Sequence, residues 1–335
     1  MNSFVSLSVS LLPVVAFLLV LITLDSFKLV RFRAVLYAIL LGAVMAVASL
    51  WLSIWLIGNI TVKLPVYVRY VAPVVEETLK AAFLIYLITR RRVGFMVDAA
   101  IFGFAVGTGF SLVENVYYFK YFADPNPLLW VIRGFGTAVM HGMAAAVMGI
   151  VSKQLSDRFS ASKYQVFLPG LVISFAIHSL YNHFFLWTGF SPIMMLVMLP
   201  IVVVVVFRAS ENATREWLGV RFDTDAELLD MINTGRAGES RVGAYLQTLQ
   251  SRFPGEVVAD MLCMLRLHLE LSIRAKGMLL MREAGFKVPR DPEIEESFRE
   301  LRFLEKSIGK TGLLAINPVL NYRDHDLWQL YMVRD

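Results

Sequence analysis

The stretch VVEETLKAAF, residues 74–83, places two adjacent glutamates and a lysine inside a run that is otherwise largely apolar from residue 67 to residue 89. A run of this length can cross a bilayer, which takes about 20 residues in a helix. Ionisable side chains inside a span cost roughly 2.5–3.5 kcal/mol each on insertion scales, so they are rarely without a role. The stretch therefore predicts a membrane helix whose function requires charge.

Composition separates the chain into two parts. Of the 335 residues 57% are hydrophobic, and the mean hydropathy is +0.61, which is typical of an integral membrane protein. Residues 1–207 hold 14 basic and 7 acidic residues, whereas residues 208–335 hold 18 and 20. We therefore predict a transmembrane domain over 1–207 and a polar domain over 208–335. The positive surplus lies in the membrane part, so we expect the lipid bilayer and not nucleic acid as its partner.

Apolar runs predict about seven transmembrane helices, at residues 4–24, 34–57, 67–89, 96–119, 128–151, 166–187 and 191–207. The loops after the first, third, fifth and seventh runs are rich in Lys and Arg, and the intervening loops are poor in them. The positive-inside rule then places the N-terminus outside and the C-terminus in the cytosol.

The cytosolic tail is expected to be helical as well, so the whole chain is predicted to be all-α. Pro254 suits the start of a helix and Gly285 suits the end of one. The predicted tail helices are residues 225–233, 239–252, 254–284 and 291–308.

Ionisable residues within the spans are confined to the third to sixth runs. At about 1.5 Å per residue, Glu76, Glu114, His141 and His178 all fall in the outer half of the bilayer. Lys80 is a natural ion-pair partner for Glu76 or Glu77, and Asn182 shares a helix face with His178 at i,i+4. Glycines and alanines in the fourth and fifth runs indicate close helix packing. Similar depth on four helices predicts one site.

The motifs on these four runs resemble those of the PrsW family of intramembrane proteases. Glu76-Glu77-x-x-Lys80 resembles its first motif and Phe110-x-x-x-Glu114 its second, while His141, and His178 with Asn182, are similar to the third and fourth. The resemblance covers residues 30–207. It implies a helical protease core in a bacterial or archaeal cell membrane and, as substrate, a single-span membrane protein such as an anti-sigma factor, or a peptide.

Peptide hydrolysis needs an activated water, a general base and a group that stabilises the oxyanion. Glu76 is our candidate for the base, and Glu77 would orient it or pair with Lys80. Two histidines and a carboxylate are a common catalytic zinc set, which assigns Glu114, His141 and His178 as ligands of a Zn²⁺ ion. A metal-free form is open too, with Glu76 and Glu114 activating water while His178 and Asn182 stabilise the oxyanion.

Two other functions fit the same pattern of charges. Glutamate and histidine networks also serve as proton relays, so a proton-coupled transporter is one alternative. A non-catalytic membrane scaffold, in which the polar groups only hold helices together, is the other. The sequence shows no inverted repeat of spans, which disfavours the transporter.

Overall fold

The computed structural model describes residues 30–121, 136–159, 164–184, 222–286 and 291–320, with a few isolated positions outside these ranges. Within them, all regular secondary structure is helical, which confirms the all-α prediction. The chain divides into two compact units, Met1–Glu211 and Asn212–Asp335.

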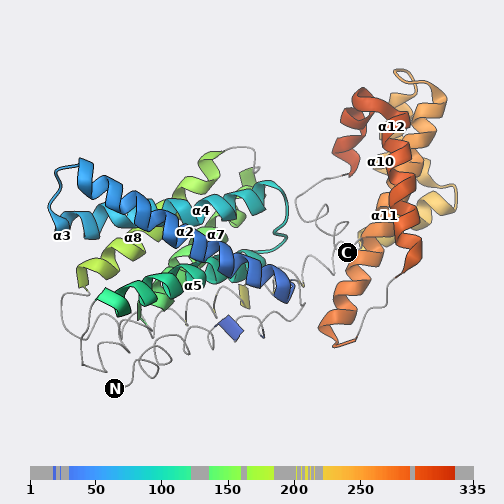
Figure 1. The fold of residues 1–335 in the computed structure, drawn as a ribbon. Helices are drawn as coiled ribbons and strands as arrows, with labels where there is room; N and C mark the ends of the chain where they lie inside the picture. Colours follow the sequence, from blue (N-terminus) through green and yellow to red (C-terminus); the bar gives the residue numbers. More distant parts are fainter. Residues whose placement is uncertain are drawn as a thin grey trace. The chain divides into compact units, whose positions relative to one another are not determined.

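The first unit is a helical bundle (Figure 1). Four helical stretches in the described residues are long and apolar enough to cross a membrane, namely α2, most of α5, α7, and η3 with α8. The helix that carries the two adjacent glutamates, α4, lies among them. Its elements are α2 (Phe32–Asn59), α3 (Leu64–Val66), the π-helix η1 (Tyr67–Val71), α4 (Ala72–Thr89), α5 (Met96–Tyr121), α7 (Ala138–Phe159), the 3-10 helix η3 (Tyr164–Phe167) and α8 (Leu168–Phe184).

The predicted spans at 34–57, 67–89 and 96–119 coincide with α2, with η1 and α4, and with α5. Helix α7 covers the predicted span at 128–151 from Ala138 onward and continues beyond it to Phe159. Lys153 donates to Asp157 at 2.5 Å one turn further on, a pair that stabilises the extra turns. The spans at 4–24 and 191–207, and with them the count of seven, lie outside the described ranges.

Helix α5 lies at the centre of the bundle, where it packs against α7 and α2. Glycine allows this close approach. A Cβ on Gly107 would lie 2.3 Å from the carbonyl oxygen of His141 in α7, and one on Gly109 would lie 1.8 Å from that of Ile39 in α2. Backbones this close leave no room for a side chain, so the glycines have the packing role that the sequence indicated.

The outer face of α2 is apolar but not buried in the protein. The helix buries one stripe, which includes Val35, Ala38 and Ala46. Its other faces expose large apolar side chains such as Trp51, Trp55 and Leu40. A surface of this kind is suited to lipid contact.

The second unit contains a helix over residues 222–233, then η4 (Ala237–Glu239), α10 (Arg241–Leu249), α11 (Gly255–Glu283) and α12 (Pro292–Leu320). Pro254 is the N-cap of α11, and Gly285, with φ of 82°, follows its C-terminal end. Both positions agree with the prediction, because proline suits a helix start and glycine tolerates positive φ beyond a helix end. The apolar sides of these helices form a separate core.

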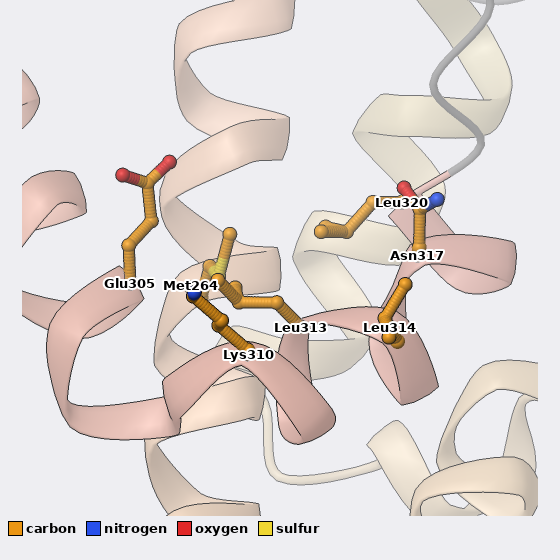
Figure 2. Close-up of a pocket in the computed structure, with 7 residues that line it drawn as sticks. All are labelled: Met264, Glu305, Lys310, Leu313, Leu314, Asn317 and Leu320. Carbon is orange, nitrogen blue, oxygen red and sulfur yellow. The ribbon is translucent and has the colours of Figure 1, made fainter.

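Helix α12 is longer than predicted. The predicted end at residue 308 coincides with a break at Gly309, where φ is 71°, but a second helical segment follows to Leu320. Figure 2 shows the open hollow that this segment forms with α11, with a volume of about 420 Å³. It is lined by Met264, Glu305, Lys310, Leu313, Leu314, Asn317 and Leu320.

Candidate active site

Four helices of the first unit bring their ionisable side chains together in one group, called the polar cluster below. Helix α4 supplies three of its members, and α5, α7 and α8 supply one each (Figure 1). The polar cluster consists of Glu76, Glu77, Lys80, Glu114, His141 and His178.

Lys80 lies at the buried centre of the polar cluster. Its ammonium donates to Oε1 of Glu77 at 2.5 Å and to Nδ1 of His141 at 2.9 Å. Lys80 and Glu77 are both about 1% exposed, so the charges compensate each other away from water. The sequence allowed Lys80 to pair with either Glu76 or Glu77, and in the structure its partner is Glu77.

These contacts determine the tautomer of His141. An ammonium group only donates, so Nδ1 must accept the hydrogen bond from Lys80. In a neutral ring the proton is then on Nε2, which donates to Oε2 of Glu114 at 2.5 Å. A continuous chain of hydrogen bonds thus links Glu77, Lys80, His141 and Glu114 across three helices.

His178 has the opposite tautomer. Its Nδ1 lies 2.8 Å from Oε1 of Glu77, and because a carboxylate accepts, Nδ1 carries the proton. In the neutral ring, Nε2 then has a lone pair. Nε2 lies 3.9 Å from Oε2 of Glu76, and that oxygen is buried with no hydrogen-bond partner among the described residues. The space between these two acceptor atoms is called the gap below.

The gap between Glu76 and His178 fits either a water or a cation. A water at about 2.8 Å from each atom could donate one hydrogen to each. A divalent ion with ligand distances of about 2.0–2.2 Å can also bridge 3.9 Å. Glu77, which accepts from the far nitrogen of His178, has the position of the carboxylate that commonly orients a metal-bound histidine.

A third possible metal ligand, His141, lies close to Glu76 and His178. Ligand atoms of Glu76, His141 and His178 all lie within 4.8 Å of one another, and one carboxylate with two imidazoles is a known zinc set. The donor types and spacing fit a divalent cation. His141 has both ring nitrogens engaged, by Lys80 and Glu114, so it would have to exchange one of these bonds to become a ligand.

The carboxylates are the most accessible part of the polar cluster. The side chain of Glu76 is 15% exposed and that of Glu114 is 22% exposed, whereas His141 is fully buried and His178 is 4% exposed. The exposed part of the polar cluster is therefore formed by Glu76 and Glu114.

The structure brings together the predicted residues Glu76, Glu77, Glu114, His141 and His178, but it arranges them differently from the predicted metal set. Glu114 bonds to His141, and it is Glu76 that completes the compact group with the two histidines. Asn182 lies one turn beyond His178, and its Nδ2 donates to the carbonyl oxygen of Val68 at 2.9 Å. That donor atom is not directed at the polar cluster.

Phe110 is a residue of the site to which sequence reasoning assigned no role. Its ring lies 5.0 Å from that of His141, and Nζ of Lys80 lies 4.8 Å from its centroid, which is a cation–π contact. The spacing of Phe110 and Glu114 at i,i+4, on one face of α5, was the available signal.

The chain matches the family model described as "PrsW family intramembrane metalloprotease" over residues 30–207, which is more than half of its length. The matched region contains every member of the polar cluster. No curated protein and no solved structure matches the chain. Together with its apolar helices, the family match establishes an integral membrane protein. The chain belongs to the PrsW family of intramembrane metalloproteases.

Proposed function

We propose that this protein hydrolyses a peptide bond of a membrane-protein substrate with a water held between Glu76 and His178. The observation that carries the proposal is the pair of unfilled acceptors, Oε2 of Glu76 and Nε2 of His178, 3.9 Å apart. A water that donates a hydrogen to each keeps its oxygen lone pairs for a carbonyl carbon. That is the orientation a hydrolytic nucleophile needs.

Glu76 acts as general base. It takes a proton as the water oxygen bonds to the scissile carbonyl carbon, and it returns a proton to the amine as the carbon–nitrogen bond breaks. Glu77 holds the ring of His178 through Nδ1, and Lys80 compensates the charge of Glu77. The buried hydrogen-bond chain thus keeps the His178 side of the gap in place.

When a divalent cation is bound, Glu76, His141 and His178 would hold it, and it would polarise the scissile carbonyl and acidify the water. The family description as a metalloprotease supports this form. Glu76 is then a ligand. Glu114, which bonds to His141, would take over the role of general base.

The substrate and topology rest on the family resemblance and the charge pattern. The substrate class is a single-span membrane protein cut near its outer boundary, as for an anti-sigma factor, in a bacterial or archaeal cell membrane. An outer N-terminus and a cytosolic tail would open the polar cluster to the extracytoplasmic side.

The test is cleavage of a single-span model substrate by the purified protein in nanodiscs. Glu76→Gln keeps the size of the side chain but removes the base, so cleavage should fall by about 100- to 10,000-fold. The matched control is Asp98→Asn, because Asp98 is a buried carboxylate of the same bundle that accepts from Gly94 and Phe95 backbone amides, away from the polar cluster. Equal activity in Glu76→Gln and the parent protein would refute the assignment.

Metal content separates the two forms of the mechanism. One equivalent of zinc in the parent protein, lost in His178→Ala, supports the metal-assisted form. Full cleavage by protein freed of metal with a chelator supports the metal-free form.

A further inference from the structure

The helix that leads to Glu76 is irregular. Residues Tyr67–Val71 form the π-helix η1, in which the amide of Ala72 donates to the carbonyl of Tyr67, five residues back. Pro73 follows, and proline has no amide hydrogen. Its missing donor would have served the carbonyl of Val68 in π-helical bonding, or that of Arg69 in α-helical bonding.

Helix α8 supplies a side-chain donor to each of these two carbonyls. The hydroxyl of Ser179 donates to the carbonyl of Arg69 at 2.7 Å, and the amide of Asn182 donates to that of Val68 at 2.9 Å. The two side chains therefore replace the bond that Pro73 cannot make. Unpaired carbonyls at this depth would otherwise be costly.

The same end of α8 makes a third contact with η1. Nδ1 of His183 donates to the carbonyl of Ser179 at 2.7 Å, because a carbonyl can only accept. Its Nε2 then accepts from the hydroxyl of Tyr70 at 3.1 Å. Helix α8 thus holds η1 at three successive residues, 68 to 70.

This contact lies directly beside the polar cluster. Ser179 follows His178, whose ring bonds to Glu77, and Pro73 lies three residues before Glu76. The direction in which α4 leaves η1 therefore sets where the carboxylate of Glu76 lies relative to His178. A small rotation at this junction would change the 3.9 Å separation.

We propose that Ser179 and Asn182 are positioning residues, which hold the π-helix η1 before Pro73 so that Glu76 lies next to His178. The proposal rests on the proposed function, because it presumes that this gap holds the reacting water. It also assigns Asn182 a role on the backbone of η1 in place of the oxyanion role considered from the sequence.

A purely structural role would give a different result from a positioning role. If the side chains only satisfied two carbonyls, any other donor would serve as well. Pro73→Ala provides such a donor, because alanine restores the missing amide hydrogen. It also allows regular α-helical bonding across the junction of η1 and α4, so it should recover some stability without recovering the position of Glu76.

The kinetic experiment compares Ser179→Ala, Asn182→Leu and their double variant with the parent protein in nanodiscs. We expect kcat of the double variant to fall by about 100-fold with KM nearly unchanged, as for a misplaced catalytic group. Ser179→Thr, which keeps the hydroxyl, should retain most of kcat. Adding Pro73→Ala to the double variant should restore part of its thermal stability but not its kcat. Full kcat in the double variant, or joint recovery of kcat and stability, would overturn the proposal.

A second readout does not depend on proteolysis, so it separates failure of this proposal from failure of the proposed function. Tyr70→Cys and His183→Cys are introduced together with Cys263→Ser, which removes the chain's one native thiol. The ring centroids of Tyr70 and His183 lie 5.0 Å apart, so the two positions face each other, and a bifunctional thiol reagent long enough to replace both rings is used. Cross-linking should be slowed about tenfold by Ser179→Ala with Asn182→Leu, the factor that one net hydrogen bond supplies. An unchanged rate would refute the positioning role even if the parent protein cleaves no tested substrate.

Discussion

Each unit of this protein buries a lysine against a carboxylate, and the two pairs differ in what surrounds them. In the second unit, Lys276 donates to Asp225 at 2.6 Å and Ser272 donates to the same oxygen at 2.8 Å. In the first unit, Lys80 also bonds to His141, and the hydrogen bonds continue to Glu114. Beside them lies Oε2 of Glu76, buried without a partner among the described residues. The Lys80 pair therefore belongs to a network that extends over three helices, whereas Asp225 accepts from Lys276 and Ser272 alone among the hydrogen bonds described here.

Replacing each lysine by methionine should give the largest effect and would test this comparison. Lys80→Met leaves Glu77 with a nearly uncompensated buried charge, so we expect about 3–5 kcal/mol of lost stability and no measurable cleavage. Lys276→Met should cost less, because Asp225 is 23% exposed and water can solvate it. Thermal unfolding and cleavage are measured for both variants. If Lys276→Met abolished cleavage in a folded protein, the two pairs would not differ as proposed.

The second unit should lose stability in acid through His268, in helix α11. Burial lowers the pKa of His268 to about 4, from an ordinary value of 6.5. Its contribution to stability is therefore fully present above about pH 6.5 and is lost as the pH falls toward 4, where the unfolded chain has bound the proton first. The loss amounts to at most about 3 kcal/mol.

Hydrogen exchange of α11 amides in the full-length protein, at pH 7 and pH 4.5, measures this loss. His268→Leu removes the titrating group and should flatten the pH dependence relative to the parent protein. An equal acid effect in both proteins would show that other groups cause it.

Two glycine substitutions compare the packing of the units. Gly107→Ala places a Cβ 2.3 Å from the backbone of His141, so α5 and α7 must separate, at a cost of about 1–3 kcal/mol and with loss of cleavage. Gly277→Ala in α11 meets no atom within 4 Å and should stabilise its helix by about 0.5–1 kcal/mol. Both are read out by thermal unfolding. If Gly107→Ala left the unfolding temperature unchanged, the result would contradict the close approach of α5 and α7.

Removal of the second unit should have the smallest effect on chemistry. All six members of the polar cluster belong to the first unit, so a chain that ends near Arg215 should keep cleavage of the model substrate within about threefold, provided that it inserts. Insertion is checked by protease protection in vesicles. Complete loss of activity in an inserted truncation would assign the second unit a role in building or gating the site.

Many of the helices and most of the candidate site residues could be predicted from the sequence alone. Apolar length predicted α2, α4 and α5 to within a few residues, because a helix that crosses a bilayer must be long and apolar. The cost of burying charge singled out Glu76, Glu114, His141 and His178, and the order of the motifs indicated the family. Pro254 and Gly285 marked the ends of α11, because each restricts or permits particular backbone angles.

Only the tertiary structure decided which polar atoms meet. Sequence spacing allowed Lys80 to pair with Glu76 or Glu77, and the choice depends on His141 and His178, which lie 61 and 101 residues from their partners in α4. The same holds for Ser179 and Asn182, whose partners are backbone carbonyls of another helix. Helical periodicity describes one helix at a time, whereas a hydrogen bond between helices depends on how both are rotated and packed. The membrane-spanning helices and the ionisable residues within them could therefore be predicted from the sequence. The gap between Glu76 and His178 arises only from the packing of α4 against α8.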